Sequence, residues 1–301
     1  MKKEIRISVI IPTYNRAHLL EKTIPTYFQE NVEEVIIVND ASTDNTKEIL
    51  IKLKEKYPNI KIFNLEKNSK QTYCKNIGMT LLSKETDYVY FGDDDSILLP
   101  NSMNYLCETL INYKADLVGA KAIYLKNKEE LENLNEVLKK VKKIPISKVK
   151  EKYLENFYCG YDIEKPIEVL ITYACFLIKK EILEKIKFSL DYKENCYREE
   201  TDFTLRVYKL GKKLMYDSRA CQINLPREQA TGGAHVNGIL GKIKWYYWLI
   251  RNNHIFVKKH YDYLKTNNYL NENKTYYEIK FALKEGKKII VAGYRKYILK
   301  K

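Results

Sequence analysis

The chain has 301 residues, of which 45% are hydrophobic and 31% are charged, and its formal net charge is +14. This composition excludes a disordered chain, and the length is enough for one large hydrophobic core or two modest ones. No apolar run reaches the roughly 18 residues that a membrane-spanning helix needs, so the sequence predicts no transmembrane helix.

The N-terminal residues and the cysteines indicate the compartment. The apolar stretch after the basic N-terminus is too short for a signal peptide and lacks a cleavage site of small residues. Six cysteines occur without the paired spacing of metal or disulfide motifs, so we expect reduced thiols. Both features favour a cytoplasmic protein.

Short β-branched runs alternate with helical segments in the first hundred residues. The predicted strands cover residues 6–11, 35–38, 60–65 and 88–91. The predicted helices cover residues 16–29, 42–57 and 70–82. This alternation predicts an α/β protein with a doubly wound, mainly parallel sheet flanked by helices.

The second half of the chain is less regular. Residues 126–165 are rich in charge and predict an exposed helical insertion or a mobile segment. Apolar order resumes in a predicted strand at 167–178, which a predicted helix at 199–210 follows. Because no glycine-rich linker separates two units, we assign residues 1–240 to one domain and residues 241–301 to a basic helical region.

The basic helical region carries most of the excess charge. Residues 242–301 contain fifteen Lys or Arg against four Asp or Glu. Aromatic and aliphatic residues interleave with the basic ones, as in KIKWYYWLIRNNHIFVKKHY, which suits a helix on an anionic membrane surface. A helix that packs on the preceding domain with solvated charges fits equally well. No nucleic-acid-binding motif accompanies the charge.

Polar clusters follow three of the predicted strands. PTYNR (12–16) follows the first strand, NDASTDNT (39–46) the second, and the triplet Asp93–Asp95 the fourth. Ligands of doubly wound sheets bind at the carboxyl ends of the strands. Three polar clusters at that edge therefore predict one binding site.

The adjacent carboxylates of Asp93, Asp94 and Asp95 predict a site for a hard cation. Mg²⁺ and Mn²⁺ prefer oxygen ligands and commonly take one or two carboxylates together with substrate phosphates. Strand alternation would place Asp93 and Asp95 on one side and Asp94 on the other. The alternative is an acidic turn in water. Asp40, after the second strand, is expected to contact a ligand, with capping of the next helix as its alternative role.

Five motifs in order resemble family 2 nucleotide-sugar glycosyltransferases of the GT-A fold. They are SVIIPTYNR, VNDASTDNT, CKNIG, FGDDDSILLP and REETDFTLR, and the resemblance covers about residues 5–226. It implies that Pro12, Thr13 and Tyr14 line the nucleotide base. It further implies that Arg16 lies near the phosphates and that Asp40 binds the base.

The resemblance also implies roles around the aspartate triplet. Lys75 stands where the family usually has arginine, and it would meet ribose or diphosphate without arginine's two-pronged geometry. Asp93 would hold ribose or a metal-bound water, Asp94 would contact ribose or sugar, and Asp95 would bind Mg²⁺ or Mn²⁺ directly. Asn224 stands where the family often has a metal-binding histidine, and His235 is the other candidate for this ligand.

Inverting transfer needs a base for the acceptor hydroxyl. The resemblance assigns Glu200 to this role, with Asp202 as the alternative, although an ion pair with Arg206 four residues later would explain Asp202 equally simply. Glu199 would bind an acceptor hydroxyl or cap the helix.

The loop after residue 226 has features of a lid. Gly232 and Gly233 make this loop a candidate to close over donor and acceptor. Arg227 could clamp the diphosphate.

These features predict a metal-dependent inverting glycosyltransferase that uses a nucleoside-diphosphate sugar, with UDP as the favoured carrier. Its acceptor would be a hydroxyl in a surface polysaccharide, glycolipid or teichoic-acid-type polymer, and the basic tail would hold it on the inner membrane face. One alternative is a sugar-phosphate nucleotidyltransferase, against which the lack of glycine in PTYNR counts. The other is an inactive nucleotide-sugar or membrane-binding module.

Overall fold

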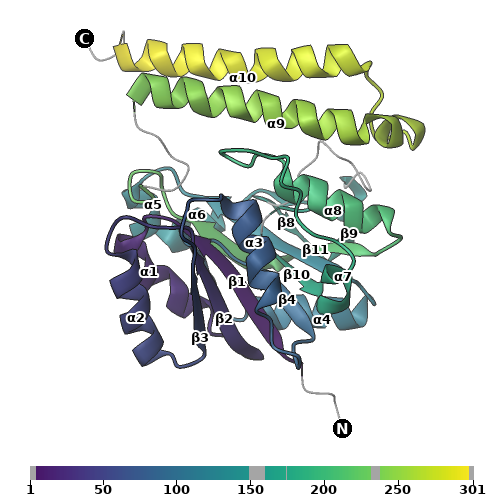
Figure 1. Ribbon diagram of the computed structural model, residues 1–301. Coiled ribbons are helices and arrows are strands. Elements are labelled where there is room, and N and C mark those ends of the chain that lie inside the picture. Colours follow the sequence, from purple (N-terminus) through teal and green to yellow (C-terminus); the bar gives the residue numbers. More distant parts are fainter. Residues whose placement is uncertain (1–4, 149–159, 174, 232–237, 298–301) are drawn as a thin grey trace.

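The computed structural model describes residues 5–148, 160–173, 175–231 and 238–297 (Figure 1). Its centre is a nine-stranded sheet in the order β3-β2-β1-β4-β10-β6-β11-β5, with β9 paired to β11. These strands are β1 (Ile7–Thr13), β2 (Val32–Asn39), β3 (Ile60–Asn64), β4 (Tyr88–Phe91), β5 (Ser96–Leu98), β6 (Leu117–Tyr124), β9 (Ile167–Glu168), β10 (Phe176–Lys179) and β11 (Leu214–Asn224).

The predicted mainly parallel sheet is confirmed. Strands β3, β2, β1 and β4 run parallel, as do β6 and β11, whereas β10 runs antiparallel between β4 and β6. The helices that flank the sheet are α1 (Ala17–Thr23), α2 (Thr46–Lys56), α3 (Gln71–Thr80), α4 (Ser102–Asn112), α7 (Lys180–Leu183) and α8 (Glu199–Lys209).

Burial on both faces explains why the parallel strands read as continuous apolar runs. On one face, Val9 and Ile11 of β1 pack in a core cluster with Leu20 and Leu50. On the other face, Ile10 packs in a second cluster with residues of α3 and β4. The sheet is thus covered on both sides, and its carboxyl edge stays available for a site.

Two predicted elements differ from the structure. The helix expected at 16–29 ends at Thr23 and continues as a 3-10 turn, η1 (Ile24–Tyr27), because Pro25 has no N–H for the helix ladder. The strand expected at 167–178 is divided into β9 and β10. Leu170 and Ile171, which lie between them, leave the sheet and pack in a core cluster with the C-terminal helices.

The charged middle segment contains short elements, most of them at the surface. They are α5 (Lys128–Glu132), α6 (Leu134–Lys139), β7 (Lys143–Ile144), a 3-10 turn η2 (Ile146–Lys148) and β8 (Asp162–Ile163). Neither α5 nor α6 has a buried residue. Strands β7 and β8 pair parallel in a separate small sheet.

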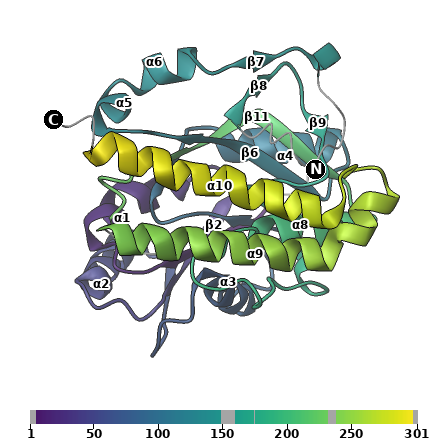
Figure 2. The same cartoon turned by 90° about the horizontal axis from the view of Figure 1, so that it is seen from above.

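The C-terminal region forms two long antiparallel helices, α9 (Gly238–Thr266) and α10 (Lys274–Tyr297). Both views show them side by side across the top of the molecule (Figures 1 and 2). Phe256 and Val257 of α9 are buried in the same cluster as Tyr192 and Leu205 of the preceding domain. Across the described residues, no helix combines the length and the apolar character that crossing a membrane requires.

Candidate active site

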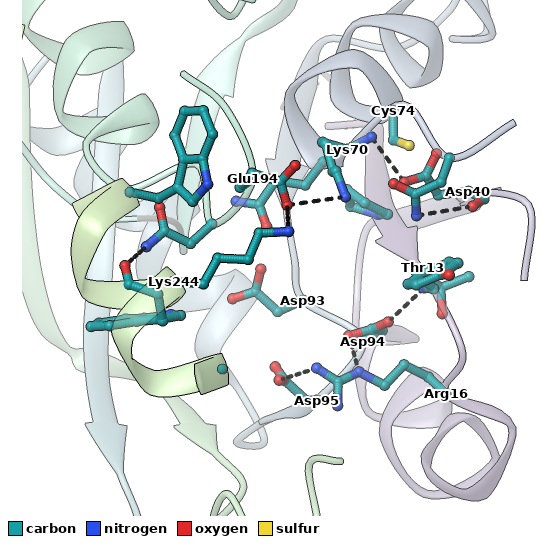
Figure 3. A pocket seen from close by; sticks show the side chains of 18 residues that line it. Thr13, Arg16, Asp40, Lys70, Cys74, Asp93, Asp94, Asp95, Glu194 and Lys244 are labelled. Carbon is teal, nitrogen blue, oxygen red and sulfur yellow. Dashed lines mark hydrogen bonds and ion pairs between the residues drawn. The ribbon is translucent and has the colours of Figure 1, made fainter. Parts of the chain in front are cut away.

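A cavity of about 440 Å³ opens at the carboxyl edge of the sheet (Figure 3). Three of its contributors are the loops after β1, β2 and β4, as the sequence predicted, and the others are the start of α3, residues 194–195 and α9. The end of β1 and these three loops contribute Pro12, Thr13, Tyr14, Arg16, Asp40, Asp93, Asp94 and Asp95 to its lining. The structure therefore brings eight predicted site residues to one cavity.

Two carboxylates of the aspartate triplet contact Arg16. Arg16 Nε is 3.3 Å from an oxygen of Asp94, and its Nη2 is 3.0 Å from Asp95. The expected alternation of side chains is wrong, because β4 ends at Phe91 and the triplet sits in the turn that follows, so all three carboxylates line the cavity. Asp93 alone of the three accepts a hydrogen bond from Gln222 Nε2, at 3.1 Å.

Asp94 is buried, and Asp93 and Asp95 are partly buried, against the preference of carboxylates for water. Burial raises the pKa of Asp93 to about 6, with the charges of Asp95 and Glu200 adding to the effect and Lys75 opposing it. Burial likewise raises the pKa of Asp94 to about 7, although Arg16 opposes this. Concentrated negative charge of this kind favours a positively charged ligand.

The oxygen donors of this site fit a metal ion whose coordination shell is completed by a bound ligand. Asp93 and Asp95 offer carboxylate oxygens to the cavity. Within the described part of the chain, no cluster of three or more His, Cys, Asp or Glu side chains could hold a metal ion by itself. Mg²⁺ commonly takes one or two carboxylates and obtains its other ligands from water and phosphate. The chemistry of Asp93 and Asp95 therefore suits such an ion.

Asp40 organises the opposite end of the cavity. Its two carboxylate oxygens accept the backbone N–H of Ser69 at 2.6 Å and of Lys70 at 2.9 Å. Lys70 has a φ of 73°, a conformation that costs free energy for a residue with a side chain and is held here by these bonds. Burial raises the pKa of Asp40 even though both hydrogen bonds oppose the shift.

Lys75 does not lie where the resemblance implied. Its side chain is only 1% exposed, and its Nζ lies 2.9 Å from Glu199 and 2.8 Å from Glu200 instead of lining the cavity. Residue 75 is on the buried side of α3, which faces the start of α8, so its cation neutralises the two glutamates. The structure thus assigns it to the glutamate pair.

The glutamate pair lies directly behind the cavity wall. Gln71, which lines the cavity, donates its amide N–H to Glu199 and, at 3.3 Å, to Glu200. The side chain of Glu199 is fully buried, whereas that of Glu200 is 16% exposed. Only Glu200 of the two therefore has partial access to solvent.

The pKa values of the two glutamates shift in opposite directions. Burial and the neighbouring charge of Glu200 raise the pKa of Glu199 well above its ordinary value. Burial also works against ionisation of Glu200, but the charge of Lys75 and the hydrogen bonds with Glu199 and Lys75 together lower the pKa of Glu200. The negative charge of the pair is therefore favoured on Glu200 over Glu199.

Asp202 is not brought to the cavity. One of its oxygens accepts hydrogen bonds from Tyr192 at 3.0 Å and is 2.8 Å from His260 Nε2, while the other is 2.7 Å from Arg206 Nε. The ion pair expected from sequence is thus present. Because His260 belongs to α9, the contact also fastens the C-terminal region to α8.

The candidates for a third metal ligand and a lid have separate outcomes. Asn224 does not line the cavity, and its amide oxygen accepts a hydrogen bond from Ser96 at 2.8 Å within the sheet. His235, Gly232 and Gly233 lie outside the described residues. The guanidinium of Arg227 lies 5.5 Å from the ring centre of Trp245 and does not line the cavity.

Sequence reasoning missed several residues of the site. Gln222 contacts Asp93 two residues before Asn224, and nothing local in the sequence marks it. On the far wall, Glu194, Lys244, Trp245 and Trp248 line the cavity. The spacing of the α9 residues on one helical face was a signal, but their basic and aromatic character fitted a membrane surface and packing on the domain equally well.

Solved structures identify the fold of the chain. A mannosyltransferase from Pyrobaculum calidifontis, in complex with GDP-Man and Mn²⁺, has a TM-score of 0.60 at 16% identity, with 97% of this chain and 75% of that chain covered. TarS 1–349 of S. aureus, in complex with UDP-GlcNAc, has a TM-score of 0.56 at 17% identity, with 88% and 75% covered. The protein has the GT-A fold of glycosyltransferases.

The chain belongs to glycosyl transferase family 2, whose profile matches residues 8–187. A GalNAc(5)-diNAcBac-PP-undecaprenol beta-1,3-glucosyltransferase of Campylobacter jejuni is 28% identical over 280 residues, which are 87% of this chain and 79% of that protein. The minor teichoic acid biosynthesis protein GgaA of Bacillus subtilis is 28% identical over 130 residues, 41% of this chain and 29% of GgaA. The resemblance stated from the motifs is confirmed, and the protein is a glycosyltransferase enzyme.

Proposed function

We propose that the protein is an inverting, metal-dependent glycosyltransferase that moves a sugar from a UDP-sugar to a hydroxyl of a lipid-linked glycan. The observation that carries this proposal is that Asp93–Asp95 line one cavity while the Glu199–Glu200 pair lies directly behind its wall, where it accepts hydrogen bonds from the cavity-lining Gln71. The C. jejuni relative is named for a glycan on undecaprenyl diphosphate, which supports an acceptor of this class.

The loops after β1 and β2 would hold the nucleotide. Pro12, Thr13 and Tyr14 supply one wall for the base, and Asp40, rigidly held by two backbone N–H groups, offers its remaining lone pairs to the uracil N–H. A TarS structure contains UDP-GlcNAc, which supports UDP as the carrier. Arg16 would face the diphosphate from the same wall.

Glu200 would act as the base. The acceptor oxygen attacks the anomeric carbon as the bond from that carbon to the diphosphate oxygen breaks, and Glu200 takes the hydroxyl proton. Lys75 keeps Glu200 ionised, which is the form that a base requires. Attack on the face opposite the leaving nucleoside diphosphate inverts the anomeric centre.

Asp95 and Asp93 would hold Mg²⁺ or Mn²⁺. When bound, such an ion stabilises the negative charge of the leaving diphosphate. Arg16 positions the Asp95 carboxylate through its 3.0 Å ion pair. Gln222 fixes the orientation of the Asp93 carboxylate from the neighbouring part of the sheet.

The outer face of α9 and α10 would lie on the inner surface of an anionic membrane. Exposed apolar side chains recur at helical spacing on both helices, namely Leu240, Ile243 and Tyr247 on α9 and Tyr276, Ile279 and Leu283 on α10. The excess of Lys and Arg in this region complements anionic headgroups. This location would bring the cavity to a lipid-linked acceptor.

A thermal-shift panel with UDP-, GDP- and dTDP-sugars, with and without Mn²⁺, tests the proposed function. We expect a UDP-sugar to raise the melting temperature most, and only with the metal. The same sugar should then be transferred to lipid-linked acceptors extracted from cells, with release of UDP. Binding without transfer would favour the inactive module, and release of pyrophosphate from a nucleoside triphosphate would favour the nucleotidyltransferase.

A further inference from the structure

We infer that α9 is a wall of the donor site, with Lys244 as a ligand of the donor diphosphate and Trp245 and Trp248 as a cover over the bound donor. This inference rests on the proposed function, because it requires a nucleotide-sugar in the cavity. It gives the basic aromatic region a role in the site in addition to any contact with membrane.

The geometry of α9 directs one face of the helix into the cavity. Gly241, Lys244, Trp245 and Trp248 are three, four and seven residues apart, which is the spacing of one helical face. All four line the cavity, whereas Lys242 between them is exposed and does not. Figure 3 shows Lys244 across the cavity from Arg16 and Asp40, with Asp93 between the two sides.

The cavity is small enough that a nucleotide-sugar must touch both sides. Pockets for cofactors and drug-sized ligands measure about 300–1,000 Å³ and enclose most of the ligand surface. The cavity of about 440 Å³ lies near the lower end of that range. A ligand bound to Asp40 and Asp95 on one side would therefore fill the space up to α9.

Buried polar contacts hold the α9 wall in place. The side chain of Asn252 is fully buried, accepts a hydrogen bond from the backbone N–H of Lys193 and donates to the Lys193 carbonyl at 2.8 Å. Asn195 Nδ2 donates to the Trp245 carbonyl at 2.9 Å. Because Lys193 and Asn195 precede α8, the wall is tied to the element that carries the proposed base.

At the mouth of the cavity, a bound anion could replace Glu194 as the ion-pair partner of a lysine. Glu194 bridges Lys70 at 3.7 Å and Lys244 at 3.4 Å, so it joins the start of α3 to α9. The two lysine side chains are 40% and 58% exposed, and ion pairs of such exposure contribute little stability. A diphosphate carries more charge than Glu194 and would replace it as the partner of Lys244.

The tryptophans supply an apolar surface over this charged floor. Trp245 and Trp248 are both partly buried, and Arg227 already lies against the Trp245 ring at 5.5 Å. Large, rigid aromatic side chains exclude water at low conformational cost, which strengthens the electrostatic contacts beneath them. These two residues are the only tryptophans among the 301 residues, so tryptophan fluorescence reports on this wall alone.

The test follows thermal shift and tryptophan quenching together in the full-length protein. UDP, GDP and dTDP are each added with Mn²⁺, and acrylamide quenching is measured at excitation wavelengths where tyrosine does not absorb. A nucleotide that raises the melting temperature should also protect the tryptophans from acrylamide. Trp245→Phe and Trp248→Phe each leave one tryptophan. In both variants, the bound nucleotide should still protect the remaining tryptophan from acrylamide.

Lys244→Gln and the matched control Lys242→Gln complete the design. We expect Lys244→Gln to weaken UDP binding about tenfold, the loss of one charge-assisted contact, while Lys242→Gln stays within about twofold. Suppose that a nucleotide raises the melting temperature, but that acrylamide quenching stays the same and that Lys244→Gln binds the nucleotide like wild type. This result would overturn the inference about α9 and leave the proposed function intact. Failure of every nucleotide to raise the melting temperature would overturn the proposed function first, and the inference with it.

Discussion

The two walls of the cavity differ in how far apart their residues lie in the chain. Tyr14, Asp40 and Asp94 on the first wall belong to loops that directly follow β1, β2 and β4. Glu194 and Lys244 on the second wall come from segments that meet only after α9 folds back over α8. The first wall is a property of strand–helix units, whereas the second depends on how the C-terminal helices pack.

Glu200→Gln should have the largest effect and tests the chemistry of α8, the helix to which the second wall is tied. Loss of the base should lower the turnover number about 10²–10⁴-fold, because the amide cannot accept the acceptor proton. UDP-sugar binding should remain, since Glu200 lies behind Gln71 and not in the cavity lining. Steady-state kinetics and calorimetric titration separate the two quantities, and wild-type turnover would remove Glu200 from its proposed role.

Phe256→Ala tests whether α9 is part of the domain or an appendage to it. Phe256 is fully buried against the core, so we expect the free energy of unfolding to fall by about 3–5 kcal/mol. Tyr247→Ala, on the exposed side of the same helix, should change it by less than about 0.5 kcal/mol. Equal effects in urea denaturation would mean that α9 does not belong to the cooperative unit.

Asp95→Ala tests the metal-binding part of the first wall. Removing this carboxylate should weaken Mn²⁺-dependent UDP binding by at least about tenfold, since even residues that only orient metal ligands have effects of this size. Asp191→Ala serves as the control, because that side chain is 63% exposed and lies outside the cavity. Titrations with and without Mn²⁺ measure the difference, and an unaltered metal requirement would argue against Asp95 as a ligand.

Substitutions on the outer face of α9 and α10 should have the smallest effect. Ile279→Asp combined with Leu283→Asp should weaken sedimentation with phosphatidylglycerol vesicles severalfold, since both side chains are exposed and apolar. Ile111→Asp, which alters an exposed isoleucine of α4, should bind the vesicles like wild type. Vesicle binding that survives the double substitution would exclude this face as the membrane contact.

The first wall could be read from the sequence because its causes are local. Strands buried on both faces have continuous apolar runs, and the polar residues after them fall at one edge by topology alone. The strands β1, β2, β3 and β4 and the cavity residues of Pro12–Arg16, Asp40 and Asp93–Asp95 followed from these patterns. Motifs that extend over a strand and the next helix are enough for such a prediction.

Tertiary structure decided the roles that depend on distant partners. Lys75 meets Glu199 and Glu200 more than 120 positions away, Gln222 reaches Asp93 from β11, and Asp202 pairs with His260 of α9. A basic aromatic helix has the same sequence pattern whether it faces a lipid surface or a cavity. The buried contacts of Asn252 and Phe256 decide which side of α9 faces the cavity. Burial of these amide and apolar groups contributes more free energy than the contact of exposed lysines with either a lipid surface or a cavity.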